Sequence, residues 1–178
     1  PRPVTHPVFY GAGEIERARE RVRQYDWAKR YLDGLIRRIE DSGILAMPDP
    51  AIRGEIFDQV SFPLPRCPVD RGKRSWRVHL WDWSPGDPNR VRCRTCGSLL
   101  PGSEHEPTGD LEVVGPSGGS VRYRYWEDDE GFRYFFDNIT FVYRQEQVTG
   151  MALPLALAHV LTGDRKYAWK AGVILARM

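Results

Sequence analysis

The spacing of the three cysteines is the feature that most constrains the fold of this chain. Cys93 and Cys96 form a C-x-x-C that is followed by Gly97, and Cys67 opens a C-P-V-D in which Asp70 stands at the same spacing. Zinc takes four ligands in a tetrahedron, from thiolate, imidazole or carboxylate groups. Two such turns can enclose one zinc ion. Binding the same ion would hold the two turns together and so restrict the path of the chain before and after each of them.

The sequence offers two candidates for the fourth ligand. Asp70 has the matching spacing, whereas His79 lies between the two turns and carries imidazole, the better donor. His105, just beyond the second turn, is a more distant candidate. The pattern therefore predicts a structural zinc site formed by Cys67, Cys93, Cys96 and either Asp70 or His79.

Two other interpretations of the cysteines remain open. A disulfide between Cys93 and Cys96 would suit a redox protein, but no βαβ pattern surrounds the pair. All three thiols can also be free and simply packed. The clustering favours the metal, which would stabilise a proline-rich segment that has few apolar residues to bury.

Charge and hydropathy argue against two classes of partner. With 26 basic and 24 acidic residues the net charge is only +2, too balanced to indicate a nucleic-acid partner. No apolar run approaches the roughly 20 residues that span a bilayer. A zinc module that binds nucleic acid stays as an alternative, because basic residues surround the cysteines: Arg66, Arg71, Lys73, Arg74, Arg77, Arg90, Arg92 and Arg94.

Both ends of the chain have helical patterns. Residues 14–24 and 26–39 predict two amphipathic helices, the second with Trp27, Tyr31, Leu35 and Ile39 on one face. At the other end, two apolar helices flank Gly163 and Asp164, a glycine stop and an N-cap. The last apolar stripe continues to Met178. We therefore expect a helical hairpin that packs on a following hairpin, in a fragment of a longer helical array.

The middle of the chain predicts strands. Apolar and polar residues alternate over 121–126 and again over 132–136, around a turn that ends at Gly131, which indicates a β-hairpin. Residues 47–65 are proline-rich and aperiodic, so we expect connecting chain there. Helix resumes at Asn138, with a break between Gly150 and Pro154.

Two stretches resemble one known family. "THPVFYGAGEIERARERVRQYDWAKRYLDGL" is similar to the opening of the heparinase II/III-like polysaccharide lyases, and "LALAHVLTGDRKYAWKAGVIL" to their first toroid hairpin. Many members also carry a cysteine-containing insertion between these landmarks, with C-P-x-C or C-P-x-H paired to C-x-x-C-G. Asp70 departs from that pattern.

The resemblance implies a fold and an activity. The fold class expected is mainly α, with a small β/zinc-knuckle insertion at the start of an incomplete (α/α) toroid from a larger α+β lyase. The segments would be 1–46 (N-terminal helices), 47–136 (insertion) and 137–178 (start of the toroid). The reaction is β-elimination in a uronic-acid polysaccharide of glycosaminoglycan or alginate type, in a periplasmic or extracellular protein. Catalytic residues are expected beyond Met178, so residues 1–178 alone are expected to be inactive.

Some residues of this chain are candidates for contact with the acidic polysaccharide. Trp81 can stack on a sugar ring, and the planar guanidinium of Arg144 suits a uronate or a sulfate. Taken alone, the residues favour ordinary packing for Trp81 and a surface helix with salt bridges for Arg144 over contact with sugar. The candidate substrate-binding residues are Trp81, Asn138, Tyr143, Arg144 and Gln145. A non-catalytic carbohydrate-binding relative is the alternative to an enzyme.

Overall fold

The structure is a computed structural model that describes residues 11–56, 66–70, 80–115 and 118–178. The chain divides into two units, each with its own core. The helical unit comprises Pro1–Ile56 and Val148–Met178, and the β-rich unit comprises Phe57–Gln147. His79 lies outside the described residues.

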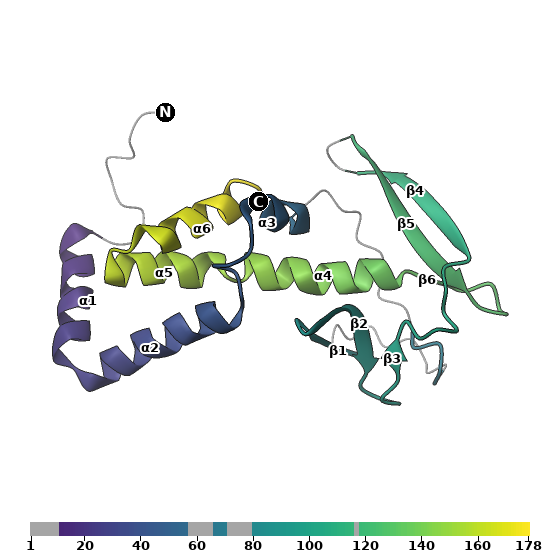
Figure 1. Ribbon diagram of the computed structural model, residues 1–178, viewed down its shortest axis with the longest axis horizontal. Coiled ribbons are helices and arrows are strands. Elements are labelled where there is room, and N and C mark those ends of the chain that lie inside the picture. Colours follow the sequence, from purple (N-terminus) through teal and green to yellow (C-terminus); the bar gives the residue numbers. More distant parts are fainter. Residues whose placement is uncertain (1–10, 57–65, 71–79, 116–117) are drawn as a thin grey trace. The chain divides into compact units, whose positions relative to one another are not determined.

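The helical unit contains α1 (Ala12–Gln24), α2 (Asp26–Asp41), α3 (Asp49–Glu55), α5 (Ala152–Thr162) and α6 (Arg165–Leu175) (Figure 1). Its core joins Ile39 of α2, Ile52 of α3, Leu155 of α5 and Ile174 of α6, none of which is exposed to solvent. The predicted face of α2 is confirmed in its second half, where Ile39 is buried and Leu35 packs against the core. In the first half it is wrong, because Trp27 and Tyr31 are exposed and Ala28 is buried instead.

The hairpin between α5 and α6 has the predicted caps. Gly163 adopts a left-handed conformation with φ of 78°, and its N–H donates to the carbonyl of His159. The side chain of Asp164 then accepts a hydrogen bond of 2.9 Å from the backbone N–H of Lys166. A glycine is favoured where φ is positive, and a carboxylate satisfies one of the unpaired N–H groups at a helix start. This local prediction is confirmed.

The expectation of a mainly helical chain that opens an (α/α) toroid is wrong. In the described residues the apolar stripe of α6, which includes Tyr167, Ala171 and Ile174, is buried in a core shared with α2, α3 and α5. These residues of α6 are therefore covered by helices that precede α6 in the chain. Two small antiparallel sheets accompany these helices, so the fold class is mixed α/β.

The β-rich unit contains two three-stranded antiparallel sheets and a helix. One sheet has the order β1 (Trp81–Ser84), β2 (Asp87–Cys93), β3 (Leu99–Leu100), and the other β4 (Gly109–Val114), β5 (Ser120–Glu127), β6 (Arg133–Tyr134). Helix α4 (Phe136–Thr149) follows β6. The core of the unit includes Trp81, Val91, Leu100, Tyr134 and Ile139.

The strands and helices in the middle of the chain agree with the predicted hairpin, agree in part with the predicted helix break, and differ from the expectation for residues 47–65. The predicted hairpin is confirmed as β5 and β6. The predicted break is confirmed at Gly150 and Met151, between α4 and α5, whereas Pro154 does not interrupt the helix and lies within α5. The stretch 47–65 was expected to lack structure, but α3 lies in it with Pro50 in its first turn. Proline is tolerated at that position, because the N–H that it lacks would have no helical partner there.

Each helix in the described part of the chain is too short or too polar to cross a bilayer.

Candidate metal centre

The second cysteine turn, residues 93–97, is shaped by the end of strand β2. Cys93 is the last residue of that strand, and its carbonyl accepts a hydrogen bond of 2.8 Å from the N–H of Gly97. Gly97 has φ of 76°, a conformation that glycine adopts without strain. The N–H of Cys93 donates to the carbonyl of Ser98, 2.8 Å away. This tight turn brings the side chains of Cys93 and Cys96 together.

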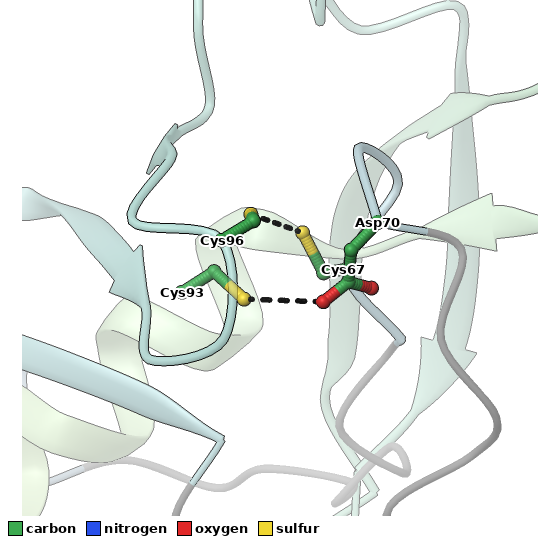
Figure 2. Close-up of side chains that lie close together, drawn as sticks. All are labelled: Cys67, Asp70, Cys93 and Cys96. Atoms are coloured by element: carbon green, nitrogen blue, oxygen red, sulfur yellow. Dashed lines mark hydrogen bonds between the residues drawn. The ribbon is translucent and has the colours of Figure 1, made fainter.

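The first turn, residues 67–70, presents Cys67 and Asp70 to the same point (Figure 2). The four ligand atoms of Cys67, Asp70, Cys93 and Cys96 all lie within 4.8 Å of one another. The Sγ atoms of Cys67 and Cys96 are 3.6 Å apart, and Sγ of Cys93 lies 3.8 Å from Oδ2 of Asp70. The arrangement leaves room for one metal ion between the thiol pair of Cys67 and Cys96 and the thiol–carboxylate pair of Cys93 and Asp70.

These distances match the edges of a zinc tetrahedron. Zn–S bonds of about 2.3 Å and Zn–O bonds of about 2.0 Å give S···S edges of about 3.8 Å and S···O edges of about 3.5 Å. The separations in this structure, 3.6 Å and 3.8 Å, lie within a few tenths of an ångström of those values. Two of the six edges of the cluster therefore fit a single zinc ion, and the other four are at most 4.8 Å long.

The thiols differ in their surroundings. Cys67 and Cys93 are buried and Cys96 is exposed. Burial raises the pKa of Cys67 to about 12, because the charged thiolate is poorly solvated there. The hydrogen bond with Ser98, 3.2 Å long, holds the pKa of Cys96 below its ordinary value. A cation at the centre would replace the proton of Cys67. Its positive charge would stabilise the thiolate in place of the solvation that burial removes.

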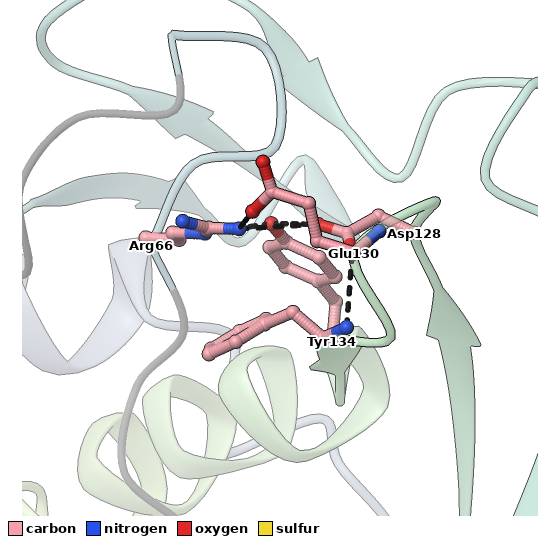
Figure 3. A network of polar contacts seen from close by, with 5 residues as sticks. Arg66, Asp128, Glu130 and Tyr134 are labelled. Atoms are coloured by element: carbon pink, nitrogen blue, oxygen red, sulfur yellow. Dashed lines mark hydrogen bonds and ion pairs between the residues drawn. The ribbon is translucent and has the colours of Figure 1, made fainter.

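A polar network next to the site anchors the first turn (Figure 3). Arg66, which precedes Cys67, contacts Glu130 at 2.5 Å and Asp128 at 3.4 Å through Nη2. Its Nε donates to the hydroxyl of Tyr134 at 3.2 Å. The turn that carries Cys67 is thereby tied to the loop between β5 and β6.

Asp128 is the centre of that network. Its Oδ1 accepts from the N–H groups of Glu130 and Phe132 at 3.0 and 2.9 Å, and its Oδ2 from the hydroxyl of Tyr134 at 2.9 Å. Burial by itself would raise the pKa of Asp128, but these hydrogen bonds favour the carboxylate and leave the pKa below its ordinary value. In the sequence Asp128 is simply a turn residue, and its partner Arg66 is distant along the chain.

The structure brings Cys67, Asp70, Cys93 and Cys96 together, but not His105. Nδ1 of His105 accepts from the N–H of Gly102 at 3.2 Å, and its ring packs edge-on against Trp126 and Phe136. All three cysteines are free, so the alternative of a Cys93–Cys96 disulfide does not describe this structure. The other proposed ligand, His79, lies outside the described residues.

The residues proposed to contact polysaccharide fall into different places. Asn138 and Arg144 line one surface hollow. The ring of Trp81 is buried, and its carbonyl accepts from the hydroxyl of Tyr143 at 3.2 Å. Gln145 lies half-buried on α4. Their contact with a polysaccharide stays a prediction.

Comparisons with family models, with curated proteins and with solved structures gave no match to this chain. The metal-ligand geometry is therefore the main guide to function.

Proposed function

We propose that Cys67, Asp70, Cys93 and Cys96 hold one structural zinc ion. The observation that carries this proposal is the convergence of four ligand atoms within 4.8 Å, three of them sulfur. Magnesium and calcium prefer sets made of oxygen ligands, whereas thiolates select zinc among the divalent ions that lack redox chemistry. Zinc accepts one carboxylate beside three thiolates.

The ion would be structural rather than catalytic. Four protein ligands complete a tetrahedron and leave no open position for water or substrate. Metal binding of this kind contributes to folding, because the unfolded chain does not hold the ligands together. The ion would join two turns that are 26 residues apart (67 to 93), and Arg66 would connect the assembled site to the loop between β5 and β6.

Zinc content tests this proposal directly. Elemental analysis of protein purified without added metal should give about one zinc per chain. Cys93→Ser should lose the zinc, whereas Asp70→Cys should retain it, because thiolate replaces carboxylate as the fourth ligand. Asp87→Ala is the matched control, since it removes one carboxylate that lies outside the ligand set.

Cobalt gives a second readout of the same ligands. Co²⁺ bound in place of zinc should show the visible absorption of a tetrahedral ion together with thiolate-to-metal charge transfer. Asp70→Cys should shift and strengthen these bands. A protein that contains no zinc, binds no cobalt and melts at an unchanged temperature after chelation would contradict the zinc proposal.

For the whole protein that carries this chain, the activity we propose is elimination in a uronic-acid polysaccharide. The support is the order of the sequence motifs, including the Leu-Thr-Gly-Asp stretch that ends α5 with Gly163 and starts α6 with Asp164. The C5 proton of a uronate becomes removable when the neighbouring carboxylate is neutralised, and the reaction then needs a base and an acid. None of these roles is assigned to a residue of this chain.

Ultraviolet absorbance of the unsaturated product tests the activity. The whole protein should produce it from at least one of heparan, chondroitin, hyaluronan and alginate. A folded protein that is silent on all four would count against the enzyme and favour a carbohydrate-binding relative. Tight, salt-sensitive binding to DNA without binding to these polymers would favour a nucleic-acid module instead.

A further inference from the structure

A hollow of about 280 Å³ lies beside strand β5 and the first turns of α4, within the β-rich unit. We call it the arginine hollow. Among the described residues β6 pairs only with Trp126 and Glu127, which leaves the earlier part of β5 without a strand on that side. The polar side chains that line the hollow are Arg122, Arg124, Arg144, Asp137, Asn138 and Thr140.

The charge of this lining is positive. Three arginines face one aspartate, so the formal balance is three minus one, or +2. Arg124 is already engaged, because its Nε and Nη2 both lie 2.8 Å from Oδ2 of Asp137. Arg122 is only loosely paired, 3.6 Å from the exposed carboxylate of Asp110. An anion that enters the hollow would therefore meet more positive than negative charge.

Two arginines are held in defined positions. Nη1 of Arg144 donates to Oδ1 of Asn89 at 2.8 Å, and its guanidinium lies 5.8 Å from the ring centre of Phe141. The ion pair with Asp137 fixes Arg124 in the same way. A guanidinium that is already oriented loses less conformational freedom when it binds a ligand.

Asn138 points to a missing hydrogen-bond acceptor. The residue is buried, with 2% of its surface exposed, and its Nδ2 has no hydrogen-bond partner within the described part of the chain. Buried amide donors are nearly always paired, so an unpaired one calls for an explanation. A ligand oxygen bound in the hollow that Asn138 lines would satisfy it.

We propose that the arginine hollow binds a carboxylate-bearing ligand. A carboxylate is planar and accepts two parallel hydrogen bonds from one guanidinium, a match that neutral ligands lack. Buried rings of Tyr123 and Phe141 form an apolar part of the wall, which suits the carbon skeleton attached to the carboxylate. The volume is near the lower end of the range for small-molecule sites, about 300 Å³, and fits a single sugar acid.

An adjoining hollow gives the ligand room to extend. It has a volume of about 290 Å³, shares Arg124 and Asp137 with the arginine hollow, and is walled by aromatic side chains that include Trp126 and Phe136. A longer ligand could place its carboxylate on the arginines and its next ring against these aromatic side chains.

A titration followed by amide NMR spectra tests the proposal on residues 1–178. Glucuronate should shift the signals of β5 and of the Asn138 side-chain amide, and glucose at the same concentration should leave them unchanged. Inorganic sulfate should bind at least fivefold more weakly than glucuronate, because it lacks the carbon skeleton that packs against the buried rings of Tyr123 and Phe141.

Three variants sharpen the test. Arg144→Met should weaken glucuronate binding at least tenfold. Asp137→Asn should strengthen it about threefold or more, because the competing carboxylate is removed from Arg124. Arg23→Met is the matched control: it removes the same charge from α1 in the helical unit and should leave glucuronate binding unchanged. A thermal melt of each variant verifies that it is folded.

Several results would overturn the carboxylate site. These are equal shifts with glucose and glucuronate, sulfate binding that is as tight, or binding that survives Arg144→Met in a folded protein. The site does not depend on the lyase proposal, although a uronate substrate would link the two. Glucuronate binding in a protein that forms no unsaturated product would keep the site and remove the enzyme. A whole protein that forms the unsaturated product although its arginine hollow fails these tests would keep the enzyme proposal and remove the carboxylate site.

Discussion

Replacing Asp128 with alanine should destabilise the β-rich unit strongly, because one carboxylate holds the loop between β5 and β6. The side chain of Asp128 is 4% exposed, yet it carries a charge. Two of the hydrogen bonds that it accepts are part-buried: one from the N–H of Phe132, at 2.9 Å, and one from the hydroxyl of Tyr134, also at 2.9 Å. Alanine leaves both donors without an acceptor.

The magnitude follows from those two bonds. A hydrogen bond to a charged group contributes about 1.5–3 kcal/mol, and a buried donor left unpaired costs about 1–3 kcal/mol. Taking about 1.5–2 kcal/mol for each of the two part-buried donors gives about 3–4 kcal/mol for the substitution. Two other partners of Asp128 are not counted. The N–H of Glu130, an exposed residue, can hydrogen-bond to water instead, and Arg66 keeps its contact with the Glu130 side chain.

Urea unfolding of the purified protein measures this loss. Asp110→Ala is the matched control, since it also removes one carboxylate, from an exposed ion pair with a separation of 3.6 Å. An exposed pair of this kind contributes about 0–1 kcal/mol. If Asp128→Ala costs less than about 1 kcal/mol, or no more than the control, the network does not hold the loop and the reasoning fails.

Acid should remove the same contribution. The pKa of Asp128 is depressed in the folded protein, so its stabilisation is present above the ordinary value of 3.8 and is lost as the pH falls through the lower, folded value. The difference in unfolding free energy between wild type and Asp128→Asn should therefore be constant near neutrality and shrink below about pH 4. Comparing the two proteins at each pH cancels the effect of acid on the metal ligands. A difference that grows in acid would contradict the assigned sign.

Three further predictions concern the metal and the helices. Chelation should lower the melting temperature of wild type but not that of Cys93→Ser, measured by circular dichroism, because the variant has no zinc to lose. Gly163→Ala should destabilise the helical unit by about 1–2 kcal/mol, since alanine is strained at φ of 78°, and a neutral result would refute the capping argument. Gly34→Ala, on the exposed face of α2 with open space around it, should stabilise by about 0.5–1 kcal/mol in the same urea assay, and a loss of stability would mean that α2 is not formed there.

The local features of this protein were readable from its sequence because they depend on neighbours in the chain. Two residues between cysteines, with a glycine after the second, suffice to predict the turn at residues 93–97. Gly163 and Asp164 end one helix and start the next through bonds that reach at most four residues. Alternation over residues 121–126 predicts a strand by the same short-range geometry.

The tertiary structure decided what these pieces pack against. The stripe on α6 shows in the sequence that Ile174 must be buried, but not that α3 supplies Ile52 to help cover it instead of a following hairpin. The sequence offered Asp70 or His79 beside the cysteines, and the folded chain places Asp70 there. The contact between Arg66 and Glu130 appears only in the folded chain, because the two residues are distant in sequence. Periodicity reports that a side chain will be buried or a charge paired. The partner is selected by packing and electrostatics summed over the whole unit, and no local pattern contains that sum.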